Sequence, residues 1–179
     1  MRDPTIARNY AEALFELGER HGETEHFATV MTGLADAIEL EPAVRVAIES
    51  PRVPKATKEQ LLRSALEQFV AEPFLRFLAA VIKRGRQGLL PLINTEYAAL
   101  VDEKLNRVRA GITLAREPDD EMRDAIQERL REVTGKDVIL RFRKDPAILG
   151  GVILRIGDRI IDGSLRRRMA RLRQHLLNT

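Results

Sequence analysis

The spacing of apolar side chains over the first hundred residues constrains the fold of this chain more than any other feature. Apolar residues recur there at intervals of three and four, as they do along one face of an α-helix. Six such segments follow one another, at about 5–20, 24–40, 42–49, 57–70, 73–84 and 89–105. Proline or glycine stands near most of the joints, where a helix ends readily. Six amphipathic helices with short connections predict a helical bundle.

The pattern changes near residue 110, where apolar and polar residues begin to alternate. Alternation is typical of β-strands, and it occurs at 111–115, 138–143, 152–156 and 160–161. Helical spacing returns at 118–135 and at 165–177. The sequence therefore predicts a mainly α protein with a small α/β part. We expect an N-terminal six-helix bundle over residues 1–108 and a smaller C-terminal α/β domain over residues 109–179.

Composition excludes several classes of protein. The 179 residues include no cysteine, so disulfides, cysteine-ligated zinc, iron–sulfur clusters and a thiol nucleophile are excluded. The only histidines, His21, His26 and His175, lack the spacing of a zinc site. Uncharged runs reach about ten residues, whereas a membrane-spanning helix needs roughly 20. The first 20 residues contain acidic side chains, whereas the core of a signal peptide is an uncharged apolar run. We expect a soluble cytosolic protein without a metal site.

Groups that could carry catalysis are better explained by local structure. A strand pattern follows Gly150-Gly151, so this pair lacks the helix N-terminus of a phosphate-binding loop. A phosphate-handling enzyme built on it is therefore a weak alternative. Three aspartates, Asp145, Asp158 and Asp162, each lie beside proline, glycine or a turn, where aspartate bonds to nearby backbone. The sequence argues against an enzyme and predicts no catalytic residue and no cofactor.

Two helical segments have apolar faces broader than one buried stripe. Along residues 5–20 one stripe holds Ile6, Tyr10, Ala13 and Leu17, and a second holds Ala7, Ala11, Leu14 and Phe15. The segment 73–84 is similarly broad. A second stripe of small residues could receive a helix of another protein. Alternatively, each helix lies centrally in its own bundle, and the residues leave this choice open.

The end of the chain is basic and amphipathic. A heptad-like apolar seam runs through Leu165, Met169, Leu172 and Leu176, with five arginines between residues 166 and 173. The first 50 residues hold 4 basic and 10 acidic side chains, and the rest hold 26 and 17. The basic, amphipathic end of the chain has two interpretations. It docks onto an acidic or amphipathic partner helix, or it is a solvated basic face at a helix C-terminus. An RNA-binding adaptor is the alternative, but the stacking aromatics of such proteins are absent nearby.

Three motifs resemble one known family. The segment from Ala7 to Phe15 (Ala-Arg-Asn-Tyr-Ala-Glu-Ala-Leu-Phe) resembles the opening of the delta subunit of bacterial F-type ATP synthase, a relative of the mitochondrial oligomycin-sensitivity-conferring protein. Residues 145–151 and 156–165 resemble the C-terminal signature of that family, with Leu165 where valine is common. The motifs have the expected order and separation, so the resemblance covers essentially the whole chain.

The resemblance implies a non-catalytic stator subunit of the peripheral stalk. Such a subunit links the catalytic head to the membrane sector, transmits coupling between them, and lies at the cytoplasmic face of the bacterial plasma membrane. The resemblance also implies that the first and fifth helices, here 5–20 and 73–84, grip the N-terminal helix of an alpha subunit. The C-terminal domain would meet the b subunits, and nucleic acid would not be a partner.

We can therefore name the residues expected at each contact. For the alpha-subunit helix they are Ala7, Tyr10, Ala11, Leu14, Phe77, Leu78 and Val81. For the b subunits they are Arg167, Met169, Arg171 and Leu172. A bulky residue at Ala7 or Ala11 is expected to block the groove without unfolding the bundle. Gly157, Asp158, Gly163 and the pair Gly150-Gly151 are interpreted as determinants of the C-terminal fold.

Overall fold

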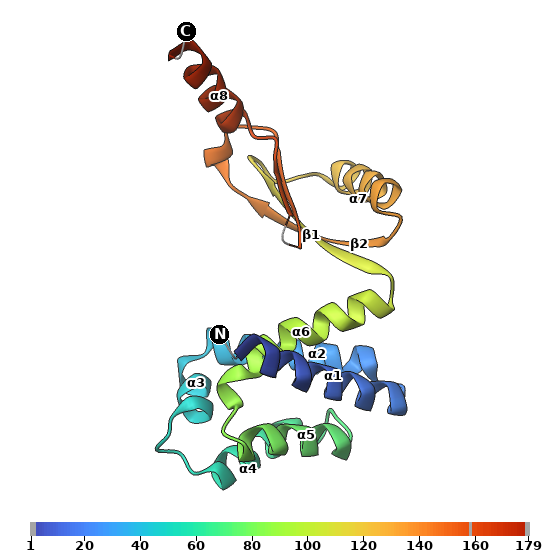
Figure 1. Ribbon diagram of the computed structural model, residues 1–179, viewed down its shortest axis with the longest axis vertical. Helices are drawn as coiled ribbons and strands as arrows, with labels where there is room; N and C mark the ends of the chain where they lie inside the picture. Colours follow the sequence, from blue (N-terminus) through green and yellow to red (C-terminus); the bar gives the residue numbers. More distant parts are fainter. Residues whose placement is uncertain (1–2, 158, 178–179) are drawn as a thin grey trace. The chain divides into compact units, whose positions relative to one another are not determined.

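The computed structural model describes residues 3–157 and 159–177 and divides the chain into two compact units, residues 1–101 and 102–179 (Figure 1). The first unit is a helical bundle, and the second combines a four-stranded sheet with helices. The predicted fold class, mainly α with a small α/β part, is confirmed. The boundary between the units lies at Val101–Asp102, inside a helix, rather than between residues 108 and 109 as predicted.

Six α-helices and one short 3-10 turn build the first unit within the described residues, in the order that the periodicity predicted. They are α1 (Asp3–His21), α2 (Thr24–Leu40), α3 (Pro42–Glu49), α4 (Lys55–Leu66), α5 (Glu72–Lys83), η1 (Gln87–Leu89) and α6 (Leu90–Lys104). Pro42 and Pro73 stand in the first turns of α3 and α5, where the missing N–H of proline costs no hydrogen bond. The predicted helix at 57–70 instead ends at Leu66, after which the Phe69 amide bonds to the Leu66 carbonyl oxygen, three residues back, as in a turn.

Two side-chain hydrogen bonds hold the turn between α1 and α2 against α6. The Tyr97 hydroxyl donates to the Thr24 carbonyl oxygen at 2.9 Å, and the Thr24 hydroxyl donates to the Glu19 carboxylate at 2.6 Å. Burial raises the pKa of Tyr97 far above its usual range, so the hydroxyl stays a donor. Gly18 is required here, since a Cβ would lie 3.0 Å from both the Thr24 Cα and the Tyr97 hydroxyl.

The second unit is a mixed sheet packed on a helix. Its elements are β1 (Arg107–Leu114), α7 (Asp120–Thr134), β2 (Asp137–Lys144), η2 (Pro146–Ile148), β3 (Val152–Ile156), β4 (Arg159–Asp162) and α8 (Leu165–Leu177). The strand order is β2-β1-β3-β4, with β1 and β2 parallel and the other pairs antiparallel. Helix α7 makes the crossover between the parallel strands (Figure 1). Its Leu130 packs in the core of the unit with Ala110, Ile112 and Val138.

Strand β1 begins at Arg107, before the predicted start at residue 111. The arginines at its beginning conceal the strand pattern, because their charges interrupt the apolar alternation. Both arginines bond to the buried carboxylate of Asp102 in α6, Arg107 from Nε at 2.9 Å and Arg109 from Nε and one terminal nitrogen. Hydrogen bonds and opposite charge from two guanidinium groups offset the cost of removing this carboxylate from water. The ion pairs therefore explain why a charged segment is folded here.

Close backbone packing joins the start of α8 to the loop after η2. The Leu165 amide donates to the Gly150 carbonyl oxygen, and the Gly163 amide donates to the Val152 carbonyl oxygen, both at 2.9 Å. Gly151 has a φ of +78°, and a Cβ there would overlap the carbonyl oxygen of Gly163. The glycines at 151 and 163 thus allow the contact that holds α8, as expected for fold determinants. Gly157 lies in the turn after β3, and Asp158 lies outside the described residues.

Replacing Gly151 by alanine should lower the free energy of unfolding by about 2 kcal/mol or more. A left-handed backbone costs an L-residue roughly 1–2 kcal/mol, and the added methyl group also overlaps the Gly163 carbonyl. Urea unfolding followed by circular dichroism measures the change. The control is Gly111→Ala in β1, whose Cβ would make only ordinary contacts with Arg155. Equal stability of the two variants would contradict the proposed close packing.

Candidate functional site

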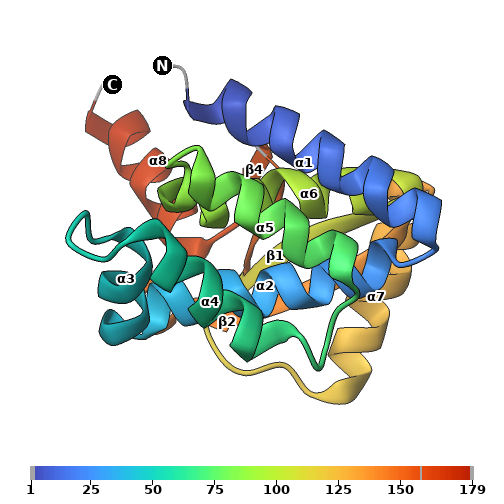
Figure 2. The same ribbon diagram turned by 90° about the horizontal axis from the view of Figure 1, so that it is seen from below.

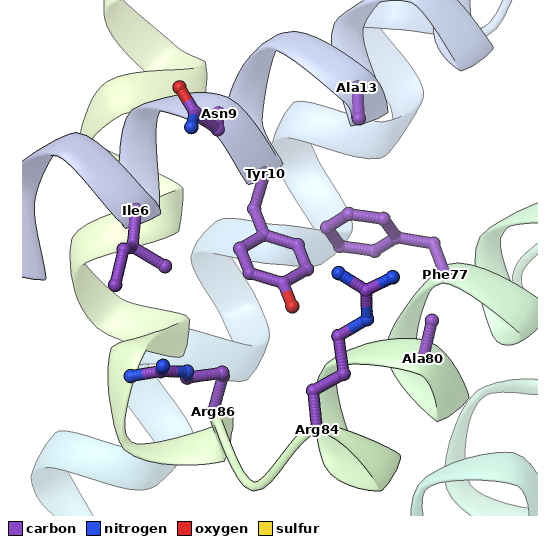
Figure 3. Close-up of a pocket in the computed structure, with 8 residues that line it drawn as sticks. All are labelled: Ile6, Asn9, Tyr10, Ala13, Phe77, Ala80, Arg84 and Arg86. Carbon is purple, nitrogen blue, oxygen red and sulfur yellow. The ribbon is translucent and has the colours of Figure 1, made fainter.

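A groove of about 700 Å³ lies between α1 and α5 in the first unit. Figure 2 shows these two helices side by side. The lining residues come from both helices and from the turn after α5 (Figure 3): Ile6, Asn9, Tyr10, Ala13, Phe77, Ala80, Arg84 and Arg86. The groove is a concave, open surface of the bundle, in the region where the resemblance placed a helix-binding site.

Two aromatic rings, one from each helix, meet across the groove. The rings of Tyr10 and Phe77 are 6.2 Å apart between centroids and inclined at 75°, an edge-to-face contact. Both side chains are half-buried and point into the space between the helices (Figure 3). Ala13 and Ala80 are exposed and small, so they leave room beside the rings. An apolar groove with small residues beside two rings can receive the apolar face of a helix.

One end of the groove is basic. Arg84 and Arg86, which follow the end of α5, both line it. In Figure 3 the Arg84 guanidinium group lies beside Phe77 and the Arg86 side chain lies nearer Ile6. Neither side chain has a hydrogen-bonding or ion-pairing partner within the described part of the chain. Sequence reasoning did not select these arginines, although Lys83-Arg84-Gly85-Arg86 is a basic cluster at the end of a predicted helix.

Only two of the seven residues expected at the alpha-subunit contact line the groove. These are Tyr10 and Phe77. The other five are at most 2% exposed and belong to the core of the bundle: Ala7, Ala11, Leu14, Leu78 and Val81. Their placement at the groove surface is wrong, because the alanine stripe of α1 faces its own bundle. The stripe that does reach the groove is the other one, at Ile6, Tyr10 and Ala13.

A second, more apolar depression of about 530 Å³ lies among α2, α3 and α4. It is lined almost entirely by aliphatic side chains, with the exposed Leu61 and Phe69 at its surface. His26 lies at its edge and bonds through Nε2 to the Phe69 carbonyl oxygen at 2.6 Å. No aspartate, glutamate, lysine or arginine lines this depression, whereas two arginines line the groove between α1 and α5.

Helix α8 presents an apolar seam to solvent in the second unit. Met169 is 61% exposed and Leu172 is 63% exposed, and Leu165 and Leu176 are exposed as well. Arg167 and Arg171 are also exposed, so none of the four residues expected at the b-subunit contact is buried in its own domain. An isolated apolar seam on an exposed helix, flanked by arginines, fits a helical partner.

Local hydrogen bonds fix where α8 begins. The Ser164 hydroxyl accepts from the Arg167 amide at 3.2 Å, as an N-terminal cap does, and Ser164 itself is buried. The Asp162 carboxylate accepts from the Ser164 amide at 2.9 Å. Hydrogen bonds from Ser164 and the positive charges of Arg167 and Arg166 hold the pKa of Asp162 below its usual range. These hydrogen bonds therefore fix the first turn of α8, the helix that carries the exposed apolar seam.

The residues considered for catalysis have structural partners. Asp145 accepts from the Ala147 amide at 3.0 Å and Asp162 from the Ser164 amide, so the turn interpretation is confirmed for these two aspartates. Among the described residues, no group of three histidine, cysteine, aspartate or glutamate side chains could hold a metal ion. None of the helices in residues 3–157 and 159–177 has the length and apolarity to cross a membrane.

Comparison with known proteins gives one consistent family. Residues 6–176 match the family model described as the ATP synthase delta (OSCP) subunit. Curated relatives named ATP synthase subunit delta include the protein of Gemmatimonas aurantiaca, 43% identical over 98% of this chain and 95% of the relative. They also include the protein of Salinibacter ruber, 34% identical over 98% of this chain and 93% of the relative.

A solved structure has the same fold. The match is a chain in the cryo-EM structure of the mitochondrial ATP synthase hexamer of Toxoplasma gondii, with a TM-score of 0.77. It covers 96% of this chain and 97% of that chain at 17% sequence identity. The likeness extends over both units and supports the fold assigned to each.

Two matched variants test which face of α1 is buried. Ala11→Leu should lower the free energy of unfolding by about 1–3 kcal/mol, because the position is fully buried and overpacking strains the core. Ala13→Leu, two residues later on the exposed face, should change the free energy of unfolding by less than about 0.5 kcal/mol. Thermal and urea unfolding measure both. An Ala11→Leu variant as stable as the parent chain would mean that α1 does not pack through its alanine stripe.

Proposed function

The chain belongs to the ATP synthase delta (OSCP) subunit family, and from this premise we propose how its two units serve the complex. It is a peripheral-stalk, or stator, subunit that links the catalytic head of an F-type ATP synthase to the membrane sector. It associates with other subunits of that membrane-bound complex and is a structural component of it. Neither the family nor the fold favours the alternative of an RNA-binding adaptor.

Such a link must resist a mechanical load. Proton flow turns the central rotor, and the resulting torque would carry the catalytic head round with it. A static connection must resist that torque if rotation is to be converted into ATP synthesis. The requirements on the chain are tight binding at both ends and stiffness between them. A protein with this role needs no catalytic group, and we propose that the chain itself catalyses no reaction.

The groove between α1 and α5 is the proposed contact with the catalytic head. We assign to it the N-terminal helix of an alpha subunit. The observation that carries this assignment is the groove itself, with the Tyr10 and Phe77 rings beside exposed alanines. An amphipathic helix could place a stripe of apolar side chains along these rings. The contacts would be made by Ile6, Tyr10, Ala13, Phe77 and Ala80.

The exposed face of α8 is the proposed contact with the stalk. We assign to it the C-terminal end of the b subunits, through Met169 and Leu172 with Arg167 and Arg171 beside them. The apolar seam would be covered by a partner helix, and the arginines would face acidic side chains at its rim. With both ends engaged, the chain would lie at the cytoplasmic face of a bacterial plasma membrane without entering it.

Blocking the groove should prevent binding of the alpha-subunit segment. Ala13→Trp fills the space beside the rings, and we expect the affinity for a peptide of the alpha N-terminal segment to fall at least roughly tenfold, or 1.4 kcal/mol. Titration calorimetry measures the dissociation constant, with a scrambled peptide as a further control.

The matched control is Ala65→Trp, an exposed alanine that lines the depression among α2, α3 and α4. Its affinity for the peptide should equal that of the parent chain. If Ala65→Trp abolished binding and Ala13→Trp left it intact, the helix would bind at the other depression. If the parent chain bound no peptide, the assignment of the groove would fail.

Charging the seam of α8 should release the b subunits. In Met169→Asp the added carboxylate lies at the proposed contact, and co-purification of the chain with a soluble b-subunit fragment should be lost. Stability should stay within about 0.5 kcal/mol, because the side chain is exposed. Val133→Asp on α7 is the matched control, an equally exposed apolar residue of the same unit. Retention of the fragment by Met169→Asp would exclude α8 as its contact.

A further inference from the structure

We propose that Arg84 and Arg86 select carboxylates at one end of the groove and thereby fix the direction in which a partner helix lies. The inference rests on the proposed function, since it concerns the helix that the groove would receive. It adds two specificity-determining residues that neither the motifs nor the family match identified. The partner is an amphipathic helix with acidic side chains at one end of its apolar stripe.

The way in which α5 ends places both arginines at the groove. Arg84 caps the helix, and the following Gly85 has a φ of +69°. The Gly85 amide donates to the Ile82 carbonyl oxygen at 2.8 Å, and the Arg86 amide donates to the Val81 carbonyl oxygen at 3.0 Å. This pair of bonds is the Schellman motif, which turns the chain sharply at a glycine. Residues on both sides of Gly85 therefore line the groove. In Figure 3 the Arg84 guanidinium group lies beside Phe77 and the Arg86 side chain lies nearer Ile6.

The positive charge of this end is not neutralised within the described residues. Both arginines are exposed, and neither side chain has an ion-pairing partner there. The other lining residues are apolar or uncharged. On the adjacent helix α1, Glu12 already accepts a hydrogen bond from Arg8 at 3.1 Å. Two cations beside an apolar surface create a positive potential that attracts a carboxylate.

The shape of the groove admits a partner helix in either direction, and the charges of the two arginines distinguish these directions. An apolar stripe can lie along the Tyr10 and Phe77 rings with the helix pointing either way, because the rings carry no charge. Both arginines follow the end of α5, whereas the lining residues Phe77 and Ala80, earlier on that helix, carry no charge. Guanidinium groups bind carboxylates through paired N–H donors, which gives orientation as well as attraction. The acidic end of the helix therefore lies over Arg84 and Arg86.

Neutral variants test the charge recognition. Arg84→Gln, Arg86→Gln and the double variant are titrated with a peptide of the alpha-subunit N-terminal segment at several salt concentrations. Each single substitution should weaken binding roughly fivefold at low salt, and the double variant should show a flatter salt dependence. A peptide with its acidic residues replaced by amides should bind all four chains equally. Lys83→Gln, which removes a charge outside the groove, should bind as the parent does.

Site-specific crosslinking tests the direction. The chain has no cysteine, so one introduced cysteine carries a unique photoreactive label. The exposed positions Gly88, just after the arginines, and Arg76, on α5 two turns before its end, serve for single Cys variants. The label at Gly88→Cys should crosslink the acidic end of the peptide, and the label at Arg76→Cys should crosslink the opposite end. In the Arg84→Gln/Arg86→Gln background this preference should disappear.

The outcomes separate the inference from the function on which it rests. If the parent chain binds the peptide and the double variant matches it in affinity, salt dependence and crosslinked ends, the arginines do not read carboxylates and the inference is overturned. If the parent chain binds no peptide, both the inference and the assigned groove fail. If a short RNA, and not the peptide, binds through the arginines, the basic end serves nucleic acid and the inference is also overturned. Thermal unfolding confirms that each variant is folded.

Discussion

Close packing of α1 through small residues is the constraint on which the helical unit depends. Ala7, Ala11, Leu14 and Gly18 are spaced by four, three and four residues and are all buried. Because three of them are alanine or glycine, the backbone of α1 can come close to its neighbours, and Gly18 lies against Thr24 and Tyr97. With that stripe buried, the adjacent stripe at Ile6, Tyr10 and Ala13 must lie at the surface beside α5. The groove is a consequence of this choice of face.

Local hydrogen bonds and close contacts restrict the conformation of both candidate contact surfaces. In the groove, the Schellman motif at Gly85 fixes the turn that carries the arginines, and the Tyr10 and Phe77 rings support each other. In the second unit, the buried Ser164 caps α8, and Gly151 permits close contact at its first turn. Preorganised surfaces pay less conformational entropy on binding than flexible ones. This suits a stator, which must hold its partners under torque.

Most of the fold followed from sequence periodicity, and the errors have specific causes. The six helices of the first unit were predicted because amphipathic stripes and proline or glycine joints mark helices locally. The start of β1 was missed because Arg107 and Arg109 interrupt the apolar alternation, and the carboxylate that compensates their charge, Asp102, belongs to the preceding helix. The early end of α4 was missed because the apolar spacing continues through Phe69 and Val70, whereas the Phe69 amide already bonds three residues back, to the Leu66 carbonyl oxygen.

The sequence by itself determined the fold class, the family motifs and the amphipathic character of α8, since each depends on residue order alone. It also showed that α1 has two apolar stripes, but not which of them is buried. Only the tertiary structure decided that Ala7 and Ala11 are in the core and that Tyr10 meets Phe77. Only it placed Arg84 and Arg86 in the lining of the same groove. The physical reason is that a stripe is buried or exposed according to the helices packed beside it, and those neighbours are distant in the sequence.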